Sequence, residues 1–318
     1  MRYRPLGDSG LMVSVVGVGC NNFGRRIDRE ASRKVVAAAV DAGVTLFDTA
    51  DTYGTPHGTS EELLGEALGS RRDDVIVATK FGSNMEGING RDFGARGSRR
   101  YVQIAVDASL RRLRTERIDL LQMHEPDPMT PIEETLSALD DLVHAGKVRY
   151  LGSSNMAGWQ ISDAEWTARS NGFERIISVQ NEYSLLQRDI EDEVIPACEK
   201  YGIGVLPYFP LAQGLLAGNY RRGERPTAGR LKNSPHLVEQ ANFDVIEALQ
   251  DYARERGISI LDLSAGWLAA QPAVASVIAG ASTPEQVNAN VAGGLWEPSA
   301  ADLARIDEIT RRDRKKES

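Results

Sequence analysis

VIVAT (residues 75–79), SRRYVQIAVDASLRRLR (98–114) and IDLLQM (118–123) form the stretch of sequence that decides the fold. In the middle segment, apolar residues recur every three or four positions, which is the period of a helix with one buried face. The two flanking runs are almost continuously apolar, as parallel strands buried on both faces are. The stretch therefore predicts a strand, a crossover helix and a second, parallel strand.

The same unit recurs along the whole chain. Further β-rich apolar runs lie at residues 15–18, 44–47, 148–152, 176–179, 203–207 and 274–278, and further helical patterns at 30–42, 60–68, 131–145 and 189–201. Eight strand-helix units predict a closed (β/α)8 TIM barrel, an α/β fold, as a single domain over residues 1–318. A doubly wound sheet would need a glycine-rich phosphate loop after an early strand, and the sequence contains no G-x-G-x-x-G.

Two additions to the barrel are expected. The opening residues predict an N-terminal β-hairpin closed by GDSG (7–10). The interval between residues 207 and 274 is much longer than the others, and it predicts a long loop (214–235) plus extra helices after the seventh strand. Because long loops in compact domains are usually functional, we expect this loop to act as a cofactor clamp or as a lid.

Composition excludes several classes of function. The 318 residues carry 37 Lys and Arg against 45 Asp and Glu, a net charge of -8, which argues against nucleic-acid binding. Cys20 and Cys198 lack the spacing of metal ligands, and so few cysteines suit a reducing compartment. The sequence shows neither a signal peptide nor a membrane span, so a cytoplasmic protein without metal or membrane partner is expected.

Polar residues follow the predicted strands at their carboxyl ends, where barrel enzymes place their active sites. Asp48, Lys80 and His124 end three successive strands, and Tyr53 lies just beyond the first of them. Each has a structural explanation on its own, such as a salt bridge between Lys80 and Asp48. Together they could reduce a carbonyl, because Tyr53 could donate a proton if Lys80 stabilised its anion. His124 could hydrogen-bond the substrate oxygen.

Seven segments, in order, resemble the aldo-keto reductases, and the pattern is nearest to the branch that includes potassium-channel β-subunits. Three of them surround the four catalytic candidates: FDTADTYG (47–54), ATKFG (78–82) and LLQMHEPDP (120–128). Four match cofactor-binding segments: VRYLGSSN (148–155), SVQNEYSLL (178–186), GVLPYFPLAQGLLAGNY (204–220) and VIAGASTPEQVNAN (277–290). The resemblance implies an NADPH-dependent reductase with Tyr53 as general acid, supported by Lys80, Asp48 and His124.

The resemblance also implies how a nicotinamide cofactor would be held. Ser154, Asn155 and Gln180 would bind the carboxamide, and Tyr208 would stack on the nicotinamide ring. Residues 211–215 would follow the pyrophosphate, and the segment after strand eight would hold the adenosine 2′-phosphate and adenine. The implied cofactor-binding residues are Gly19, Cys20, Asn21, Asp48, Ser154, Asn155, Gln180, Tyr208, Phe209, Pro210, Leu211, Gln213, Gly214, Leu215, Arg230, Gly280, Ser282, Gln286 and Asn290.

The cofactor segments depart from the family pattern at a few positions. Cys20 and Asn21 stand where many relatives have Thr and Trp. Ala289 replaces a Glu that often contacts adenine, and Gln286 is uncharged where some relatives place Arg. We therefore expect NADPH/NADP+ as the cofactor, with NADH as a weaker alternative.

Two other functions fit parts of the sequence. A cofactor-binding regulatory subunit is the first, but the histidine position altered in the channel-subunit branch is intact as His124. A Schiff-base aldolase built on Lys80 is the second, and it would need that amine unpaired. For a reductase, an apolar wall would suit a small aldehyde or ketone. Its candidate residues are Phe23, Phe81, Met85, Phe93, Phe209 and Trp296. The sequence sets neither the physiological substrate nor the oligomeric state.

Overall fold

The computed structural model describes residues 1–227 and 230–310 and shows the predicted (β/α)8 barrel. Its eight strands pair in parallel, in the order β10-β3-β4-β5-β6-β7-β8-β9. The strands are β3 (Val16–Gly19), β4 (Leu46–Asp48), β5 (Ile76–Phe81), β6 (Ile118–Met123), β7 (Val148–Ser154), β8 (Ile176–Gln180), β9 (Gly204–Val205) and β10 (Val277–Gly280).

Residues beside β9 and β10 close the barrel. Val205 donates its backbone N–H to Ala273 O at 2.7 Å and accepts from Ala275 N at 2.9 Å. Beyond this bridge, Ile278 N donates to Pro207 O at 3.2 Å. The first and last strands of the series are thus joined, and all carboxyl ends surround one opening.

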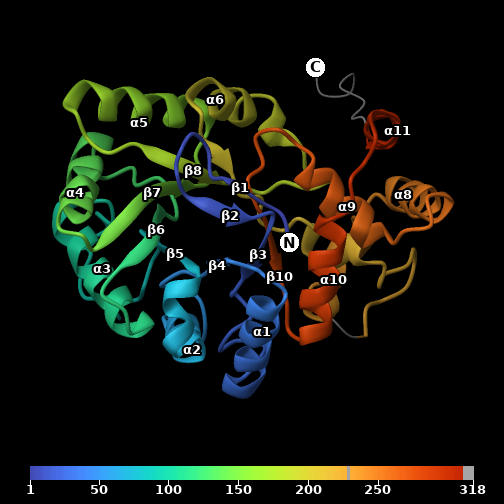
Figure 1. Cartoon of the computed structure of the whole chain (residues 1–318), viewed down its shortest axis with the longest axis horizontal. Helices are drawn as coiled ribbons and strands as arrows, with labels where there is room; N and C mark the ends of the chain where they lie inside the picture. The colour runs from blue at the N-terminus through green and yellow to red at the C-terminus, as the bar shows by residue number, and fades with distance from the viewer. Residues whose placement is uncertain (228–229, 311–318) are drawn as a thin grey trace.

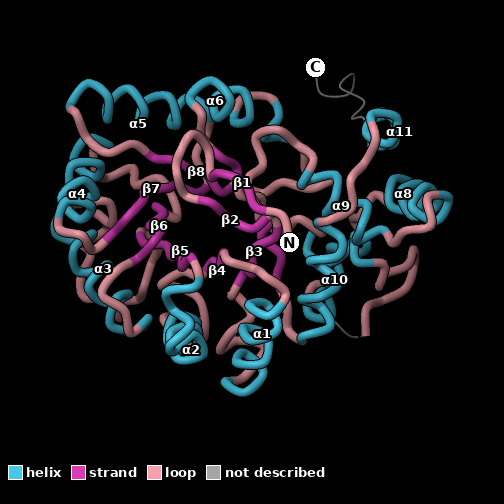
Figure 2. The backbone as a smooth tube through the Cα atoms, viewed as in Figure 1, coloured by secondary structure: helices cyan, strands magenta, loops and turns pink. Residues whose placement is uncertain are grey.

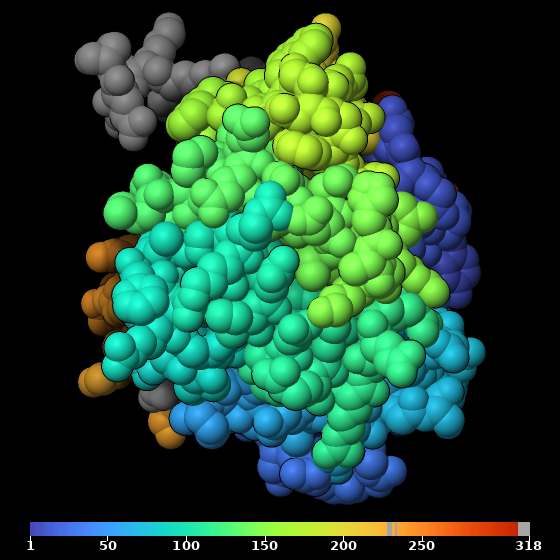
Figure 3. All heavy atoms as spheres, turned by 90° about the vertical axis from the view of Figure 1, so that its left-hand side faces the viewer, coloured from blue at the N-terminus to red at the C-terminus, as the bar shows by residue number. Residues whose placement is uncertain are grey.

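Helices form the outer layer of the barrel. Figures 1 and 2 show them outside the ring of strands, and Figure 3 shows the side of α3, α4 and α5 as a continuous wall. The eight barrel helices are α1 (Arg29–Asp41), α2 (Thr59–Leu68), α3 (Arg99–Leu113), α4 (Ile132–His144), α5 (Gly158–Asn171), α6 (Val194–Tyr201), α9 (Ile260–Ala269) and α10 (Pro284–Gly294). No helix of the described part is both long and apolar enough to cross a membrane.

The predicted hairpin closes the end of the barrel opposite the strand carboxyl ends. It consists of β1 (Tyr3–Pro5) and β2 (Met12–Ser14), which pair antiparallel. Leu6 and Val13 are fully buried and join the inner barrel residues Leu46, Ala78, Leu120, Leu206, Ala275 and Ile278 in one apolar cluster. Gly7 has a positive φ of 58°, and a Cβ there would lie 2.5 Å from Gly202 O, so this tight approach requires glycine.

The long interval after β9 contains the extra helices that the sequence predicts. Besides α9 it carries two additional α-helices, α7 (Pro235–Glu239) and α8 (Phe243–Glu255), and two short 3₁₀ helices, η3 (Ala212–Ala217) and η4 (Arg230–Asn233). A C-terminal helix, α11 (Ala300–Thr310), packs against α8. These segments lie together on one side of the barrel (Figure 1).

Several element boundaries differ from those predicted. The predicted helix at 189–201 divides into η2 (Asp189–Glu191) and α6, because the ring of Pro196 would clash with a helical carbonyl four residues earlier. The eighth strand begins at Val277 rather than Val274, which forms only an isolated bridge to Val205. Strand β4 begins at Leu46 rather than at Val44, where the predicted apolar run begins.

Candidate active site

A buried ion pair lies at the carboxyl ends of β4 and β5. The Lys80 ammonium donates to Asp48 Oδ2 at 2.6 Å and to the Thr49 carbonyl at 3.0 Å. Lys80 is 0% and Asp48 2% exposed. Burial of two charges is unfavourable unless both are paired and hydrogen-bonded, as they are here.

Two glutamine side chains complete the environment of Asp48. Its second oxygen, Oδ1, accepts from Gln122 Nε2 at 3.0 Å and from Gln180 Nε2 at 2.9 Å. Gln122 lies on β6, two residues before His124, and was not among the residues predicted from the sequence. A polar residue within a mainly apolar strand was the signal available for it. With three donors the Asp48 carboxylate is fixed in position, and so is Lys80.

Tyr53 and His124 lie side by side above this ion pair. The Lys80 ammonium is 5.0 Å from the centroid of the Tyr53 ring. The Tyr53 and His124 rings meet edge to face, with centroids 5.8 Å apart. The four catalytic candidates, which three successive strands and one loop supply, are therefore brought together in space.

Burial determines the charge states of both rings. It raises the pKa of Tyr53 above its ordinary value of 10.0, although the Lys80 charge opposes this shift. It lowers the pKa of His124 to about 3, with a further contribution from Lys80. At neutral pH the phenol is therefore protonated and the imidazole is uncharged. The Lys80 pKa is raised, because its interactions with Asp48 and Tyr53 outweigh the opposing effect of burial.

The two ring nitrogens of His124 have different surroundings. Nδ1 is buried and has no hydrogen-bond partner among the described residues. An unpartnered N–H would be more costly there than an unprotonated nitrogen, so the proton belongs on Nε2. Because His124 lines the large cavity described next, Nε2–H can donate to a ligand oxygen.

A cavity of about 910 Å³ extends from this cluster along the carboxyl ends of the strands. Its volume lies within the range of small-molecule and cofactor sites. Of the predicted site residues, those that line it are Gly19, Asn21, Asp48, Tyr53, His124, Ser154, Asn155, Gln180, Tyr208, Phe209, Pro210, Leu211, Gln213, Gly214, Gly280, Ser282, Gln286 and Asn290. The described residues contain no group of three or more His, Cys, Asp or Glu arranged to hold a metal ion.

Four predicted site residues are not among those that line the cavity. Cys20 is fully buried, and it meets the site only through its backbone N–H, which donates to Asp48 O at 2.8 Å. Lys80 lies beneath the cavity floor, and Leu215 packs against the core. The side chain of Arg230 lies outside the described residues.

A chain of hydrogen bonds joins the predicted nicotinamide end of the cavity to His124. The Tyr208 hydroxyl donates to Asn155 Oδ1 at 2.9 Å, and Asn155 Nδ2 donates to the His124 carbonyl at 3.0 Å and to Ser154 Oγ at 3.1 Å. Ser154 Oγ in turn donates to the Gln180 carbonyl at 2.7 Å. These bonds fix the side chains around a space that a flat amide-bearing ring could fill.

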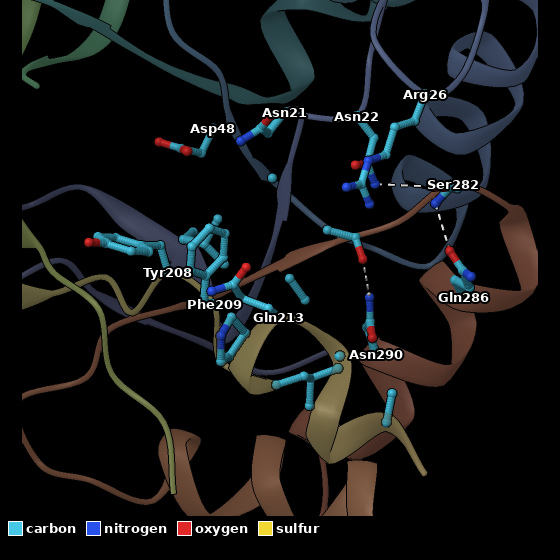
Figure 4. A pocket seen from close by; sticks show the side chains of 18 of the residues that line it. Asn21, Asn22, Arg26, Asp48, Tyr208, Phe209, Gln213, Ser282, Gln286 and Asn290 are labelled. Carbon is cyan, nitrogen blue, oxygen red and sulfur yellow. Dashed lines mark hydrogen bonds between the residues drawn. The ribbon is translucent and has the colours of Figure 1, made fainter. Parts of the chain in front are cut away.

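The other end of the cavity lies between the loops that follow β3 and β10 (Figure 4). Asn22 Nδ2 donates to Ser282 Oγ at 3.1 Å and so ties the two loops together. Gln286 Oε1 accepts from Ser282 N at 2.7 Å, and Asn290 Nδ2 donates to the Gly280 carbonyl at 3.3 Å. Asp48 and Tyr208 lie at the opposite end of the same view.

The cavity also contains residues that the sequence analysis did not assign to the site: Asn22, Arg26, Ala217, Asn219, Tyr220, Leu261, Ile278, Ala279 and Ala289. Asn22 and Arg26 belong to NNFGRR (21–26), directly after β3. The rule that polar residues follow strand ends, applied to this strand as to the others, was the signal for them.

The expected apolar wall was largely wrong. Only Phe209 of its six candidates lines the cavity. Phe23, Phe81 and Met85 are buried, at 0–1% exposure, whereas Phe93 is 74% exposed and contacts Arg100. Trp296 packs against α9, where a Cβ on Gly266 would lie 2.6 Å from its ring. Apolar residues near strand ends therefore fill the space between barrel and helices, and polar residues face the opening.

The donor set fits a nicotinamide dinucleotide. Uncharged amides and hydroxyls gather beside Tyr53 and His124, an aromatic ring flanks them, and polar side chains of the β10-α10 region lie at the far end. The barrel and this site are typical of oxidoreductases. Comparison with known proteins agrees: residues 15–311 match the model of the Aldo/keto reductase family, and the chain belongs to that family.

Three relatives illustrate the range of that family. The chain is 35% identical over 293 residues to an uncharacterized oxidoreductase, YrpG, of Bacillus subtilis (strain 168), covering 90% of this chain and 89% of the relative. It is 35% identical over 302 residues to a probable voltage-gated potassium channel subunit beta of Oryza sativa subsp. japonica (92% and 90%). It is 34% identical over 323 residues to an L-glyceraldehyde 3-phosphate reductase of Escherichia coli (strain K12) (97% and 92%).

Proposed function

We propose that the protein is an NADPH-dependent reductase that converts small aldehydes or ketones to alcohols. The observation that carries this proposal is the arrangement of Tyr53, His124 and the Lys80–Asp48 pair at one end of a cavity of about 910 Å³. Two hydrogen-bonding groups, one of them able to give up a proton, face the same space. Membership of the Aldo/keto reductase family supports an oxidoreductase in general.

Each catalytic side chain has a distinct role in the proposed reaction. The Nε2–H of His124 hydrogen-bonds the substrate carbonyl oxygen and orients it, and the neutral ring keeps this donor over the physiological pH range. The Tyr53 hydroxyl donates its proton to the same oxygen as negative charge develops there. The Lys80 ammonium stabilises the resulting phenolate, and Asp48 holds Lys80 in place. Solvent then reprotonates Tyr53.

The residues that would hold the cofactor divide into three groups. Ser154, Asn155 and Gln180 would bind the carboxamide, and Tyr208 would lie against the nicotinamide ring, which supplies the hydride for the carbonyl carbon when bound. Gln180 Nε2 already donates to Asp48, so its Oε1 is the atom available to the carboxamide. The loop at 211–215 would follow the pyrophosphate. Ser282, Gln286 and Asn290 would contact the adenosine.

The geometry of the site supports the two alternative functions less well. A Schiff-base aldolase needs a free, uncharged Lys80, whereas this amine is fully buried and paired with Asp48 at 2.6 Å. A regulatory subunit with little turnover is favoured only by relatives described as channel subunits. The neutral, pocket-lining His124 beside Tyr53 supports turnover instead.

A substrate panel tests the proposal. The purified chain is mixed with NADPH or NADH and a series of aldehydes and ketones, and loss of the reduced-nicotinamide absorbance is followed. We expect turnover with several small carbonyl compounds and a preference for NADPH. Tight binding of either cofactor without turnover on any compound would support the regulatory subunit. A substrate adduct trapped by borohydride without cofactor would support the aldolase.

A further inference from the structure

Arg26 is the one Lys or Arg among the described residues that line the cavity. It follows β3 and precedes α1. Its guanidinium forms no hydrogen bond or ion pair with any residue that the structure describes, although most arginines of this chain have an acidic partner. A cation that faces a binding cavity without a protein partner is available to an anionic group of a ligand.

The backbone around Arg26 holds this side chain at the cavity. The carbonyl of Asn22 accepts from the N–H groups of Arg25, Arg26 and Ile27, at 3.2, 2.9 and 3.1 Å. Gly24 N donates to Ile27 O at 3.0 Å, which closes the turn, and the buried Phe23 ring anchors it in the core. The position of Arg26 therefore does not depend on a mobile loop tip.

The turn also determines which end of the cavity Arg26 serves. Asn22 reaches from the same turn to Ser282 Oγ and, at 3.4 Å, to the Ala281 carbonyl. Figure 4 shows the Arg26 side chain running inward beside Asn22, on the side of Ser282 and away from Tyr208. Arg26 thus belongs to the end of the cavity where Ser282, Gln286 and Asn290 lie, far from the site of proton transfer.

The other side chains at this end are uncharged. Asn22, Ser282, Gln286 and Asn290 offer amide and hydroxyl groups, and each of the four already bonds to another of them or to the backbone. A dianionic phosphate held by such groups alone would keep most of its charge uncompensated. A guanidinium presents several N–H donors in one plane and matches a phosphate well.

We propose that Arg26 binds the adenosine 2′-phosphate of NADPH and is the residue that makes the protein prefer NADPH to NADH. The inference rests on the proposed function, because it assumes that the cavity holds a nicotinamide dinucleotide. NADH carries a hydroxyl at the same position and gains nothing from the guanidinium. A charge-assisted pair of this kind corresponds to about a ten- to hundredfold difference in affinity.

The test compares dissociation constants of wild type, Arg26→Ala, Arg26→Lys and Arg25→Ala for NADPH, NADH, adenosine 2′,5′-bisphosphate and AMP. Arg25 is the matched control, because it is the preceding residue, is exposed, and does not line the cavity. We expect Arg26→Ala to weaken NADPH and the bisphosphate about ten- to hundredfold and to leave NADH and AMP unchanged. Arg26→Lys should restore part of the loss, and Arg25→Ala should match wild type.

Several results would overturn the inference. Equal losses for NADPH and NADH would place Arg26 on the pyrophosphate, and unchanged affinities would mean that it contacts no phosphate. Loss of the NADPH preference in Arg230→Ala but not in Arg26→Ala would transfer the role to Arg230. If wild type reduces carbonyls with NADPH, each of these results leaves the proposed function intact. If wild type binds no dinucleotide, both the function and the inference fail.

Discussion

Lys80 and Asp48 show how a single buried contact both stabilises a site and limits its chemistry. The pair has almost no exposure, and its charges are balanced by a 2.6 Å ion pair and the two glutamine amides. Removal of one partner of such a pair is far more costly than replacement of both. The stability of single and double variants can therefore be predicted separately from their activity.

Lys80→Met should destabilise the protein by about 3 to 5 kcal/mol, because it leaves the Asp48 carboxylate buried without a counter-charge. The double variant Asp48→Asn with Lys80→Met should recover most of this loss and remain inactive. Urea unfolding of the three proteins gives the free energies. A double variant no more stable than the single one would mean that the ion pair is not what stabilises this region.

The neutral His124 makes stability depend on pH. Its pKa in the folded protein is about 3, below the ordinary value of 6.5 that applies to the unfolded chain. The stability due to the uncharged ring is thus present above about pH 6.5 and is lost as the pH falls toward 3. His124→Gln should therefore lose less stability than wild type between about pH 7 and pH 4, measured by urea unfolding at each pH.

His144 provides the control for this measurement. It is exposed on α4, and a backbone hydrogen bond and the charge of Asp140 raise its pKa, the opposite direction to that of His124. His144→Gln should therefore not reduce the loss of stability in acid. If it did so as much as His124→Gln, the acid dependence would not come from the buried ring.

Close packing between neighbouring helices restricts the size of the side chains at their contacts. Gly65 lies in α2, and a Cβ there would lie 2.3 Å from the Leu113 carbonyl at the end of α3. Helix propensity alone predicts that Gly65→Ala stabilises the protein by about 0.5 to 1 kcal/mol. We expect destabilisation by about 1 to 3 kcal/mol instead, because the backbone of α3 must shift. Thermal or urea unfolding measures the sign.

Glu62→Ala is the matched substitution for Gly65→Ala. Glu62 is exposed in the same helix, so the change should alter stability by less than about 0.5 kcal/mol. A Gly65→Ala protein at least as stable as wild type would show that α2 and α3 can separate at this point without cost.

Most strands were predictable from the sequence, but some helices were not. Strand β6 occupies the predicted residues, since a short, mainly apolar run bounded by polar residues favours a strand. The helix α5 was not marked out, because Trp159 and Trp166 are 66% and 57% exposed and obscure the apolar face. The segments between β9 and α9 depend on tertiary contacts, such as the 3.1 Å hydrogen bond from Leu231 N to the Tyr220 hydroxyl.

Residues that line the cavity were predictable wherever a polar residue ends a strand or directly follows it. Asp48, His124, Ser154 and Gln180 were found in this way, and each lines the cavity. Hydrogen-bond partners one layer deeper, such as Gln122, were missed because nothing in a single sequence shows which inward residues meet across a barrel. Nothing in a single sequence shows either that Cys20 is fully buried in the core and does not line the cavity.

At the scale of the whole molecule, barrel closure joins distant parts of the chain. Val205 bonds to Ala273 and Ala275, and the hairpin residue Leu6 packs against inner residues of strands throughout the sequence. Because the ends of the strand series stabilise each other, we expect one cooperative unfolding transition for the whole domain. Equal calorimetric and van't Hoff enthalpies would agree with this. Two separate transitions would show that part of the barrel folds independently.

The exchange of Tyr53 for Phe tests the central claim most directly. The substitution removes the proposed proton donor and leaves the cofactor cavity unchanged. NADPH affinity should stay near that of wild type, while carbonyl reduction should fall by about 10² to 10⁴-fold, the contribution of a positioned general acid. The measurement is turnover of the best substrate together with the NADPH dissociation constant for both proteins. A Tyr53→Phe protein that binds NADPH and keeps more than about a tenth of wild-type turnover would contradict the account.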